Sequence, residues 1–328
     1  PGESLMEFAL TDEQQELAST VRALLDKRAD SAAVRSAMQS EPGYDEALWQ
    51  TLCEQIGVAA LVVPEEHDGV GASLFETAVV LEELGRSLAP NPLLATTIAA
   101  AALLLHGSDE QRADLLPRIA AGTIATAVLE PPVVLEPAAE IVLIPRADAL
   151  ELFEARPEAR PALDPTLRLG HLDTTSAPSQ PLRDLATALV TALQLGCARR
   201  GLDMTVAYAQ ERVQFGRPIG SFQALKHRMA DLLVLLEMTR SASWAATGAA
   251  SSYLQSPTAE RAATLHERAT VAKAYCSDAL DRIASETIQL HGGIAITWEH
   301  DAHLVFKRAH ALGQLFGQAH EHRSRIPL

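Results

Sequence analysis

Three unusually long stretches in the second half of the chain carry apolar residues at helical spacing. These stretches cover residues 182–210, 221–251 and 258–290, and a shorter one follows at 302–318. Long helices joined by short loops pack antiparallel around a shared core. The sequence therefore predicts a four-helix bundle over residues 182–328. Four leucines of the first helix form a stripe that we expect to face the core: Leu182, Leu185, Leu189 and Leu193.

The first part of the chain also has helical patterns. Thr11 and Gln14 have the spacing of a capping box, which predicts that a first helix begins there. Further helices are predicted at residues 45–56, 74–88, 93–105 and 109–121. With Met6 expected as the native start, residues 6–125 form an all-helical N-terminal domain.

Residues 126–181 differ in character from both helical parts. They are rich in proline and contain only short apolar runs, such as residues 141–145, which are typical of short strands. This segment is predicted to be a reduced β domain. The expected fold class is mainly α, with the β domain between the N-terminal helices and the bundle.

Charge and cysteine content limit the possible partners and compartment. The 27 basic and 42 acidic residues give a net charge of −15, which disfavours nucleic acid and anionic membrane surfaces. Cys53, Cys197 and Cys276 lie far apart without metal-ligand spacing, and we expect each to be a small core residue in a reducing cytoplasm. The sequence has no signal-peptide pattern and no uncharged apolar run of membrane-spanning length.

The segment from residue 211 to 231 combines a cation, an aromatic ring and amides in a short loop between two long helices. One helix is expected to end at Gln210 or Glu211 and the next to start near Ser221 as an N-cap, with Phe215 in the turn. Arg212 then lies at a helix end, where complementing the helix dipole contributes about 0.3–1 kcal/mol. Taken alone, Arg212 is a surface charge and Phe215 a hydrophobic plug.

A second motif ends the third long helix. Gln289, Gly292 and Gly293 form a Q-x-x-G-G pattern. Taken alone, a Gly-Gly pair after a helix is only a C-terminal stop that tolerates positive φ.

Together these two motifs resemble signatures of the acyl-CoA dehydrogenase family, in the family's order and rough spacing. The phrases LVVPEEHDGVGAS, VLEELGRSLAPNPLL and GSDEQRADLLPRIAAGT extend the resemblance through the N-terminal half. In the family, the matching residues contact the adenosine diphosphate half of a neighbouring subunit's FAD. The resemblance implies this cofactor-binding role for Arg212, Gln214, Phe215, Gln223, Gln289, Gly292 and Gly293.

The sequence departs from the family where a carboxylate base is needed to remove the substrate's α proton. Motif counting puts Phe316 at the usual position of the Glu and Ala186 at the position used by a smaller group. Asp184, two residues from Ala186, is expected to point about 200° away on the helix. Only Leu129-Glu130-Pro131 resembles the segment that opens the family's flavin-binding β domain. No catalytic residue is assigned.

Other polar residues are expected to have no catalytic or metal-binding role. Glu299 and Asp301 are expected to be solvated loop charges. Four histidines have no zinc-ligand spacing, and those near the C-terminus are expected in a solvated tail: His291, His310, His320 and His322. No metal site is predicted.

With these departures, the chain resembles the short β subunits of α2β2 acyl-CoA dehydrogenases in steroid-degrading actinobacteria. The resemblance implies a longer catalytic α subunit as partner, FAD shared across the interface, a bulky CoA thioester as substrate and an electron-transfer flavoprotein as electron acceptor. Two alternatives stay open. One is a homo-oligomeric dehydrogenase whose base is Asp184, Glu130 or Glu136, and the other is a non-enzymatic acyl-CoA-binding or scaffold protein.

Overall fold

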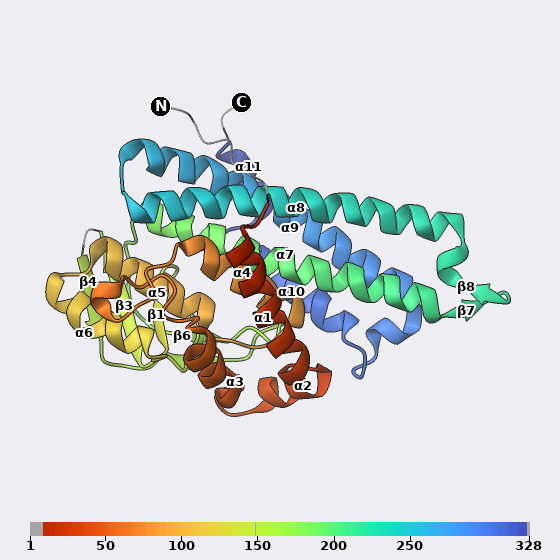
Figure 1. Cartoon of the computed structure of the whole chain (residues 1–328), viewed down its shortest axis with the longest axis horizontal. Helices are drawn as coiled ribbons and strands as arrows, with labels where there is room; N and C mark the ends of the chain where they lie inside the picture. The colour runs from red at the N-terminus through yellow and green to blue at the C-terminus, as the bar shows by residue number, and fades with distance from the viewer. Residues whose placement is uncertain (1–8, 148, 327–328) are drawn as a thin grey trace.

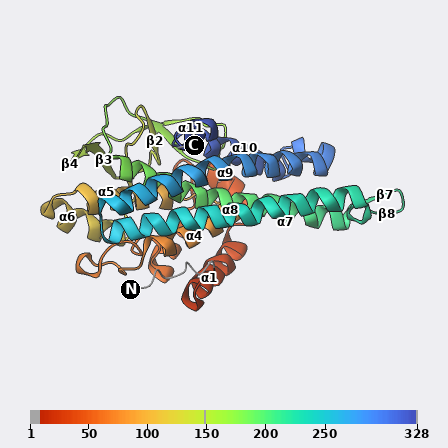
Figure 2. The same cartoon turned by 90° about the horizontal axis from the view of Figure 1, so that it is seen from above.

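The computed structural model describes residues 9–147 and 149–326, so Met6 lies outside the described residues. Three long helices, α7 (Gln180–Glu211), α8 (Gln223–Gln255) and α9 (Ala259–His291), run side by side along the longest axis in both views (Figure 1, Figure 2). With α10 (Ala302–Gln314) they form the predicted four-helix bundle. The structure confirms a mainly helical fold with a small β domain.

The last predicted helix is shorter than expected. α10 ends at Gln314 because Phe316 and Gly317 take φ values of 59° and 99°, which a helix cannot contain. A short α11 (Ala319–Ser324) follows.

The N-terminal helices are α1 (Asp12–Arg28), α2 (Ser31–Gln39), α3 (Glu46–Thr51), α4 (Leu74–Ser87), α5 (Leu93–His106) and α6 (Asp109–Ala120). The capping box of Thr11 and Gln14 is formed as predicted. Helix α2, which no prediction included, is capped by the Asp30 carboxylate on the Ala33 amide. The predicted helix at residues 45–56 is α3 continued by one π-helical turn, η1 (Leu52–Ile56), and a short 3-10 turn, η2 (Glu65–His67), precedes α4.

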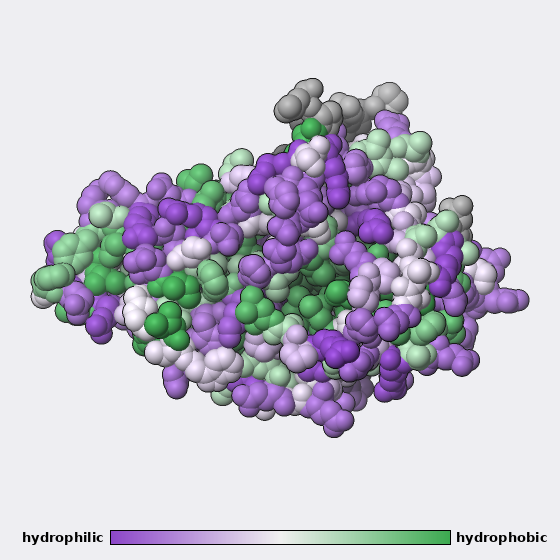
Figure 3. Space-filling model, turned by 180° about the vertical axis from the view of Figure 1, so that it is seen from behind, coloured by the Kyte–Doolittle hydropathy of each residue, from purple (hydrophilic) through white to green (hydrophobic). Residues whose placement is uncertain are grey.

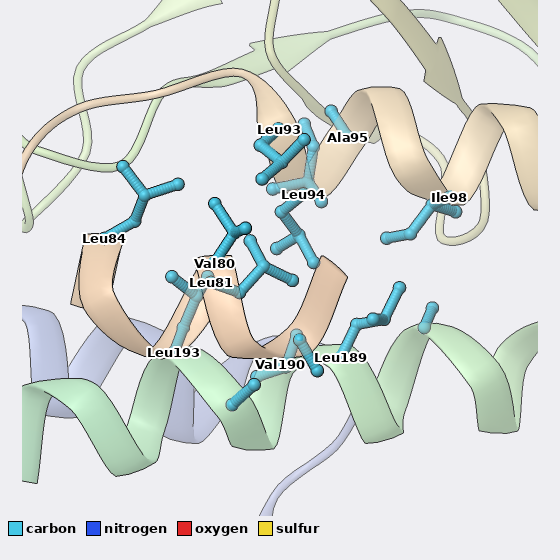
Figure 4. Packing of buried hydrophobic residues seen from close by; sticks show 14 of the residues in the cluster. Val80, Leu81, Leu84, Leu93, Leu94, Ala95, Ile98, Leu189, Val190 and Leu193 are labelled. Atoms are coloured by element: carbon cyan, nitrogen blue, oxygen red, sulfur yellow. The ribbon is translucent and has the colours of Figure 1, made fainter. Parts of the chain in front are cut away.

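Close contact between α4 and α7 joins the N-terminal helices to the bundle. A Cβ on Gly196 would lie 1.9 Å from the Glu82 carbonyl oxygen, and one on Gly85 would lie 2.5 Å from the Leu193 carbonyl oxygen. Glycine at both positions therefore lets the two backbones touch. Around this crossing, apolar side chains of α4, α5 and α7 interdigitate in one core (Figure 4). All four leucines of the predicted stripe are buried, as expected: Leu182, Leu185, Leu189 and Leu193.

The β domain contains two small sheets. The first has the order β1-β3-β4 and the second β2-β6-β5. Their strands are β1 (Ala125–Ala127), β2 (Val133–Leu135), β3 (Ile141–Arg146), β4 (Ala149–Phe153), β5 (Glu158–Arg160) and β6 (Leu169–His171). Strand β3 contains the apolar run predicted at 141–145. The domain boundaries proposed at residues 6–125, 126–181 and 182–328 stay a prediction.

None of the helices in the described part of the chain combines the length and the apolar character needed to cross a bilayer.

Candidate functional site

A two-residue hairpin projects from one end of the bundle, between α7 and α8 (Figure 1). Strand β7 (Val213–Gln214) pairs with β8 (Arg217–Pro218), and the turn residues Phe215 and Gly216 have φ values of 53° and 76°. Two consecutive left-handed residues are the hairpin geometry that matches strand twist. The turn leaves 92% of the Phe215 surface exposed. Phe215 therefore has a strained backbone and a ring exposed to solvent, and it does not fill a gap in the hydrophobic core.

The polar residues of this motif are displayed around the hairpin. Arg212 caps α7 through its amide, which donates to the Tyr208 carbonyl, and the Arg212 carbonyl accepts from Ile219. Gln214 and Gln223 are also exposed. The Gln223 amide lies 2.9 Å from Nε2 of His227, which orients it at the first turn of α8.

The predicted N-cap at Ser221 is wrong. Ser221 belongs to the 3-10 turn η3 (Ile219–Ser221), and its hydroxyl donates to the Pro218 carbonyl. Phe222 occupies the N-cap position, and its side chain makes no cap hydrogen bond. Because η3 follows the hairpin directly, α8 begins only at Gln223.

The second motif lies at the end of α9. Gly292 ends this helix with φ 64° and ψ −144°, a conformation that is essentially restricted to glycine, and η4 (Gly292–Ile296) follows. A Cβ added to Gly292 or Gly293 would meet no atom of this chain within 4 Å. The neighbouring Gln289 is exposed. The turn therefore presents bare backbone at an open surface, which is a suitable cradle for a group that approaches closely.

Tertiary contact brings the ends of α7 and α9 together. The ring of Tyr208, one turn before Arg212, stacks on His291, with ring centroids 4.5 Å apart and an interplanar angle of 26°. His291 in turn lies 4.8 Å from the ring of His300. Burial lowers the pKa of His291, and its Nδ1 lies 2.7 Å from the Thr287 carbonyl oxygen. Sequence reasoning missed Tyr208, whose only signal was its spacing of four residues from Arg212.

A polar cavity of about 570 Å³ lies at the opposite end of α7. Phe316 and Asp184 both line it, together with Glu130, His266 and His322. Ala186, in contrast, is fully buried in the core. Asp184 and Ala186 therefore point in different directions, as their helical spacing predicts, but Asp184 is the one that faces the cavity and Ala186 faces the core.

Asp184 is the most enclosed carboxylate of this cavity. Its oxygens accept from Nε2 of Gln180 at 2.9 Å and from Nδ1 of His266 at 3.0 Å. Burial raises its pKa, against the lowering effect of the Gln180 hydrogen bond and the His266 contact. Glu130 lies 3.9 Å from Arg183 and is about half exposed. Glu136 does not line the cavity, and burial raises its pKa to about 7.

Two polar residues expected in solvent are buried or bonded. Asp301 accepts from Ser31 at 2.6 Å and from Arg35 at 2.8 Å, and lies 3.3 Å from Arg200. Burial acts to raise its pKa, but the Ser31 and Arg35 hydrogen bonds and the Arg200 charge lower it overall.

His322 is also buried, with Nε2 2.9 Å from the Phe316 carbonyl oxygen, so it is not part of a solvated tail. Glu299 is exposed, as expected.

The cysteines have the passive character that their spacing predicted. Cys197 and Cys276 are fully buried and Cys53 is partly buried. Burial raises the pKa of each thiol to about 12, so none provides a thiolate nucleophile near neutral pH.

Comparison with known proteins agrees with this geometry. Residues 11–123 match the family model "Acyl-CoA dehydrogenase, N-terminal domain", and residues 185–326 match "Acyl-CoA dehydrogenase, C-terminal domain". The chain is 45% identical to the acyl-CoA dehydrogenase IpdE2 of Mycolicibacterium smegmatis, over 97% of this chain and 98% of that protein. It is 46% identical to IpdE2 of Mycobacterium tuberculosis, over 96% of both chains.

Two solved structures share its architecture. One is the Tcur3481-Tcur3483 steroid ACAD, with a TM-score of 0.81, 27% identity and 96% of each chain covered. The other is the ChsE4-ChsE5 complex of Mycobacterium tuberculosis, with a TM-score of 0.81, 26% identity and 98% of this chain and 97% of that chain covered. From its two family-model matches and its identity to IpdE2, this chain belongs to the acyl-CoA dehydrogenase family.

Proposed function

We propose that this chain is the non-catalytic subunit of a heteromeric, FAD-dependent acyl-CoA dehydrogenase. Its role is to complete the adenosine diphosphate end of the FAD site of a longer catalytic partner. The residues proposed for this contact are Arg212, Gln214, Phe215, Gln223, Gln289, Gly292 and Gly293. The observation that carries the proposal is the exposed hairpin, which holds Phe215 outward at a cost in backbone strain.

Geometry at the bundle end supports a contact with a bound anion. The chain carries a net charge of −15, yet no carboxylate among the described residues lies within ion-pair distance of the Arg212 guanidinium. Gly292 and Gly293 offer an unobstructed backbone surface nearby. A diphosphate fits this combination, since it needs charge-assisted donors and close backbone approach.

The cavity supports the division of labour between two subunits. Phe316, at the position where most relatives hold a carboxylate base, cannot take a proton from a substrate. FAD bound in the assembled enzyme would supply the hydride acceptor for the substrate's β hydrogen. The α proton would then be removed by the partner's base, with this chain acting through positioning alone.

Partner and substrate are proposed from the relatives. The Tcur3481-Tcur3483 steroid ACAD and the ChsE4-ChsE5 complex each combine two differently named proteins. We propose that this chain forms an α2β2 assembly with its partner. The assembly would dehydrogenate a bulky, steroid-derived acyl-CoA and pass electrons to an electron-transfer flavoprotein. We expect it to work in the cytoplasm, where free cysteines such as these three persist.

Flavin content tests this proposal. The chain is purified alone and then together with a longer acyl-CoA dehydrogenase chain from the same source, and visible flavin absorbance is measured against protein concentration. We expect a colourless chain alone and about one FAD per heterodimer. Arg212→Ala should weaken FAD binding by the complex about 10- to 100-fold, from a charge-assisted contact of about 1.5–3 kcal/mol. Stoichiometric FAD on the chain alone would contradict the proposal.

The homo-oligomeric enzyme remains as a second candidate because Asp184 and Glu130 line the same cavity as Phe316. It requires a flavin-loaded chain that reduces a dye with acyl-CoA in the absence of any partner. Asp184→Asn would then abolish activity, whereas Glu136→Gln, outside the cavity, would not. A scaffold protein would bind its partner but leave FAD retention unchanged on Arg212→Ala.

A further inference from the structure

Arg217 shares a face of the hairpin with Arg212 and Gln214. In the hairpin register, Gln214 lies opposite Arg217. The Ile219 amide donates to the Arg212 carbonyl at 2.8 Å, so Arg212 lies opposite Ile219. Side chains alternate between the faces of a strand, and directly opposed residues point to the same side. Arg212, Gln214 and Arg217 therefore project from one face, and Val213 and Pro218 from the other.

Aromatic contacts hold the Arg217 guanidinium in place. Its central carbon lies 4.0 Å from the ring centroid of Phe222, a cation–π geometry. The Phe222 ring makes an edge contact with Phe215, with centroids 6.1 Å apart. A guanidinium packed on a ring loses less side-chain entropy when it binds a ligand than a freely rotating one.

The Arg217 charge is not neutralised within the chain. Arg217 is exposed, and no carboxylate of residues 9–147 and 149–326 forms an ion pair with it. Two half-buried arginines of α8 differ, since Arg240 pairs with Glu237 and Arg228 with Glu286. A hairpin that leaves two guanidinium groups unpaired on one face is built to bind an anion from another molecule.

We propose that Arg217 is a second guanidinium for the diphosphate of a dinucleotide held by the partner subunit. Arg212 reaches one phosphoryl group and Arg217 the other, with the Gln214 amide between them. Two guanidinium groups match the two negative charges of a diphosphate. This inference rests on the proposed FAD contact and extends it to a residue outside the family motif.

The test compares FAD dissociation constants of the reconstituted heteromer, measured by flavin fluorescence at several salt concentrations. Arg217→Met keeps an apolar side chain on Phe222 but removes the charge, and we expect about 10- to 100-fold weaker FAD binding with a shallower salt dependence. Arg217→Lys keeps the charge and should recover most of the affinity. Arg240→Met, which removes an internally paired arginine, is the matched control and should leave FAD affinity unchanged.

The outcomes separate this inference from the function on which it rests. If Arg212→Ala weakens FAD binding while Arg217→Met binds as the unmodified complex does, the role of Arg217 is overturned and the proposed function survives. Equal loss in Arg217→Met and Arg217→Lys would show that a positive charge at this position does not support FAD binding, and would also overturn it. If neither Arg212→Ala nor Arg217→Met changes the affinity, both fail together.

Discussion

Tyr208 and His291 stack with their ring centroids 4.5 Å apart, and this contact joins the two segments proposed to hold the cofactor. Tyr208 lies one turn before Arg212 on α7, and His291 directly precedes Gly292 on α9. The stack therefore connects the helix end before the hairpin to the helix end before the Gly-Gly turn. Each segment is exposed on its own, and this contact between half-buried Tyr208 and buried His291 links the two.

Removing the stack should loosen both segments. We expect Tyr208→Leu to lower the free energy of unfolding by about 0.5–1.5 kcal/mol beyond its change in buried area, and Tyr208→Phe to retain the stack. Urea unfolding of the isolated chain measures the first effect, and FAD retention in the heteromer measures the second. Equal stability and equal FAD retention in Tyr208→Leu and Tyr208→Phe would show that the contact is dispensable.

The two glycines of the α9 turn should respond differently to alanine. Gly292 has φ 64° and ψ −144°, so Gly292→Ala should destabilise the isolated chain by about 1–3 kcal/mol. Gly293 has no positive φ and space around an added Cβ, so Gly293→Ala should leave the isolated chain stable. In the heteromer, Gly293→Ala should still weaken FAD binding, because the methyl group would face the cofactor. A Gly293→Ala complex with normal FAD affinity would refute close approach at this residue.

A buried ion pair fastens the β domain to the bundle. Nε of Arg308 on α10 lies 2.7 Å from Oδ2 of Asp164, with both side chains almost fully buried, and Nη2 of Arg308 donates to the Thr166 carbonyl at 2.9 Å. Removing one partner leaves a buried charge uncompensated, so Asp164→Asn should cost about 3–5 kcal/mol. The exposed pair of Arg146 and Glu151 is the control, and Glu151→Gln should cost less than about 1 kcal/mol in the same urea titration.

Lys273 should give the chain a pH-dependent stability. Its ammonium group is fully buried and donates to Ser277 Oγ, the Leu312 carbonyl and the Gly313 carbonyl at 3.2, 2.8 and 3.1 Å. Burial lowers its pKa to about 7 from 10.5. Between these values the unfolded chain binds more protons than the folded chain, so the free energy of unfolding rises with pH, by up to about 1.4 kcal/mol per pH unit.

The measurement for Lys273 is a difference. Urea unfolding of the unmodified chain and of Lys273→Met is compared at pH 7.0, 7.5, 8.0 and 8.5. Unfolded thiols begin to ionise in this range, but both proteins contain the same three cysteines, so their contribution cancels in the difference. The advantage of Lys273→Met should shrink as pH rises, although that variant leaves the Leu312 and Gly313 carbonyls without this donor. Parallel pH profiles for the two proteins would mean that Lys273 stays fully protonated in the fold.

A carboxylate at residue 316, where motif counting predicts the family's base, should not create an enzyme. Phe316→Glu places a carboxyl group at the wall of the cavity beside His322, but the isolated chain should remain colourless and inactive with acyl-CoA and a redox dye. A yellow, active Phe316→Glu chain would show that the β domain of this subunit holds a flavin ring by itself.

Local sequence chemistry determined most of the secondary structure. Helical periodicity gave the long bundle helices, Thr11 and Gln14 gave the first cap, and the two motif ends fell at Glu211 and Gly292 as expected. These features depend on residues within one or two turns of each other, so they can be predicted without knowing the fold. Resemblance added the family and the roles proposed for the exposed motif residues.

Tertiary structure alone decided which side each helix turns toward its neighbours. Asp184 faces the cavity and Ala186 the core, and close backbone contact at Gly85 and Gly196 holds α4 against α7. Asp301 is held by Arg35 and Arg200, which are distant in sequence, so its burial could not be inferred from its polar loop. The stack of Tyr208 on His291 likewise joins residues from two helices. Periodicity fixes which residues share a helix face, but only the packing of whole helices fixes what that face contacts.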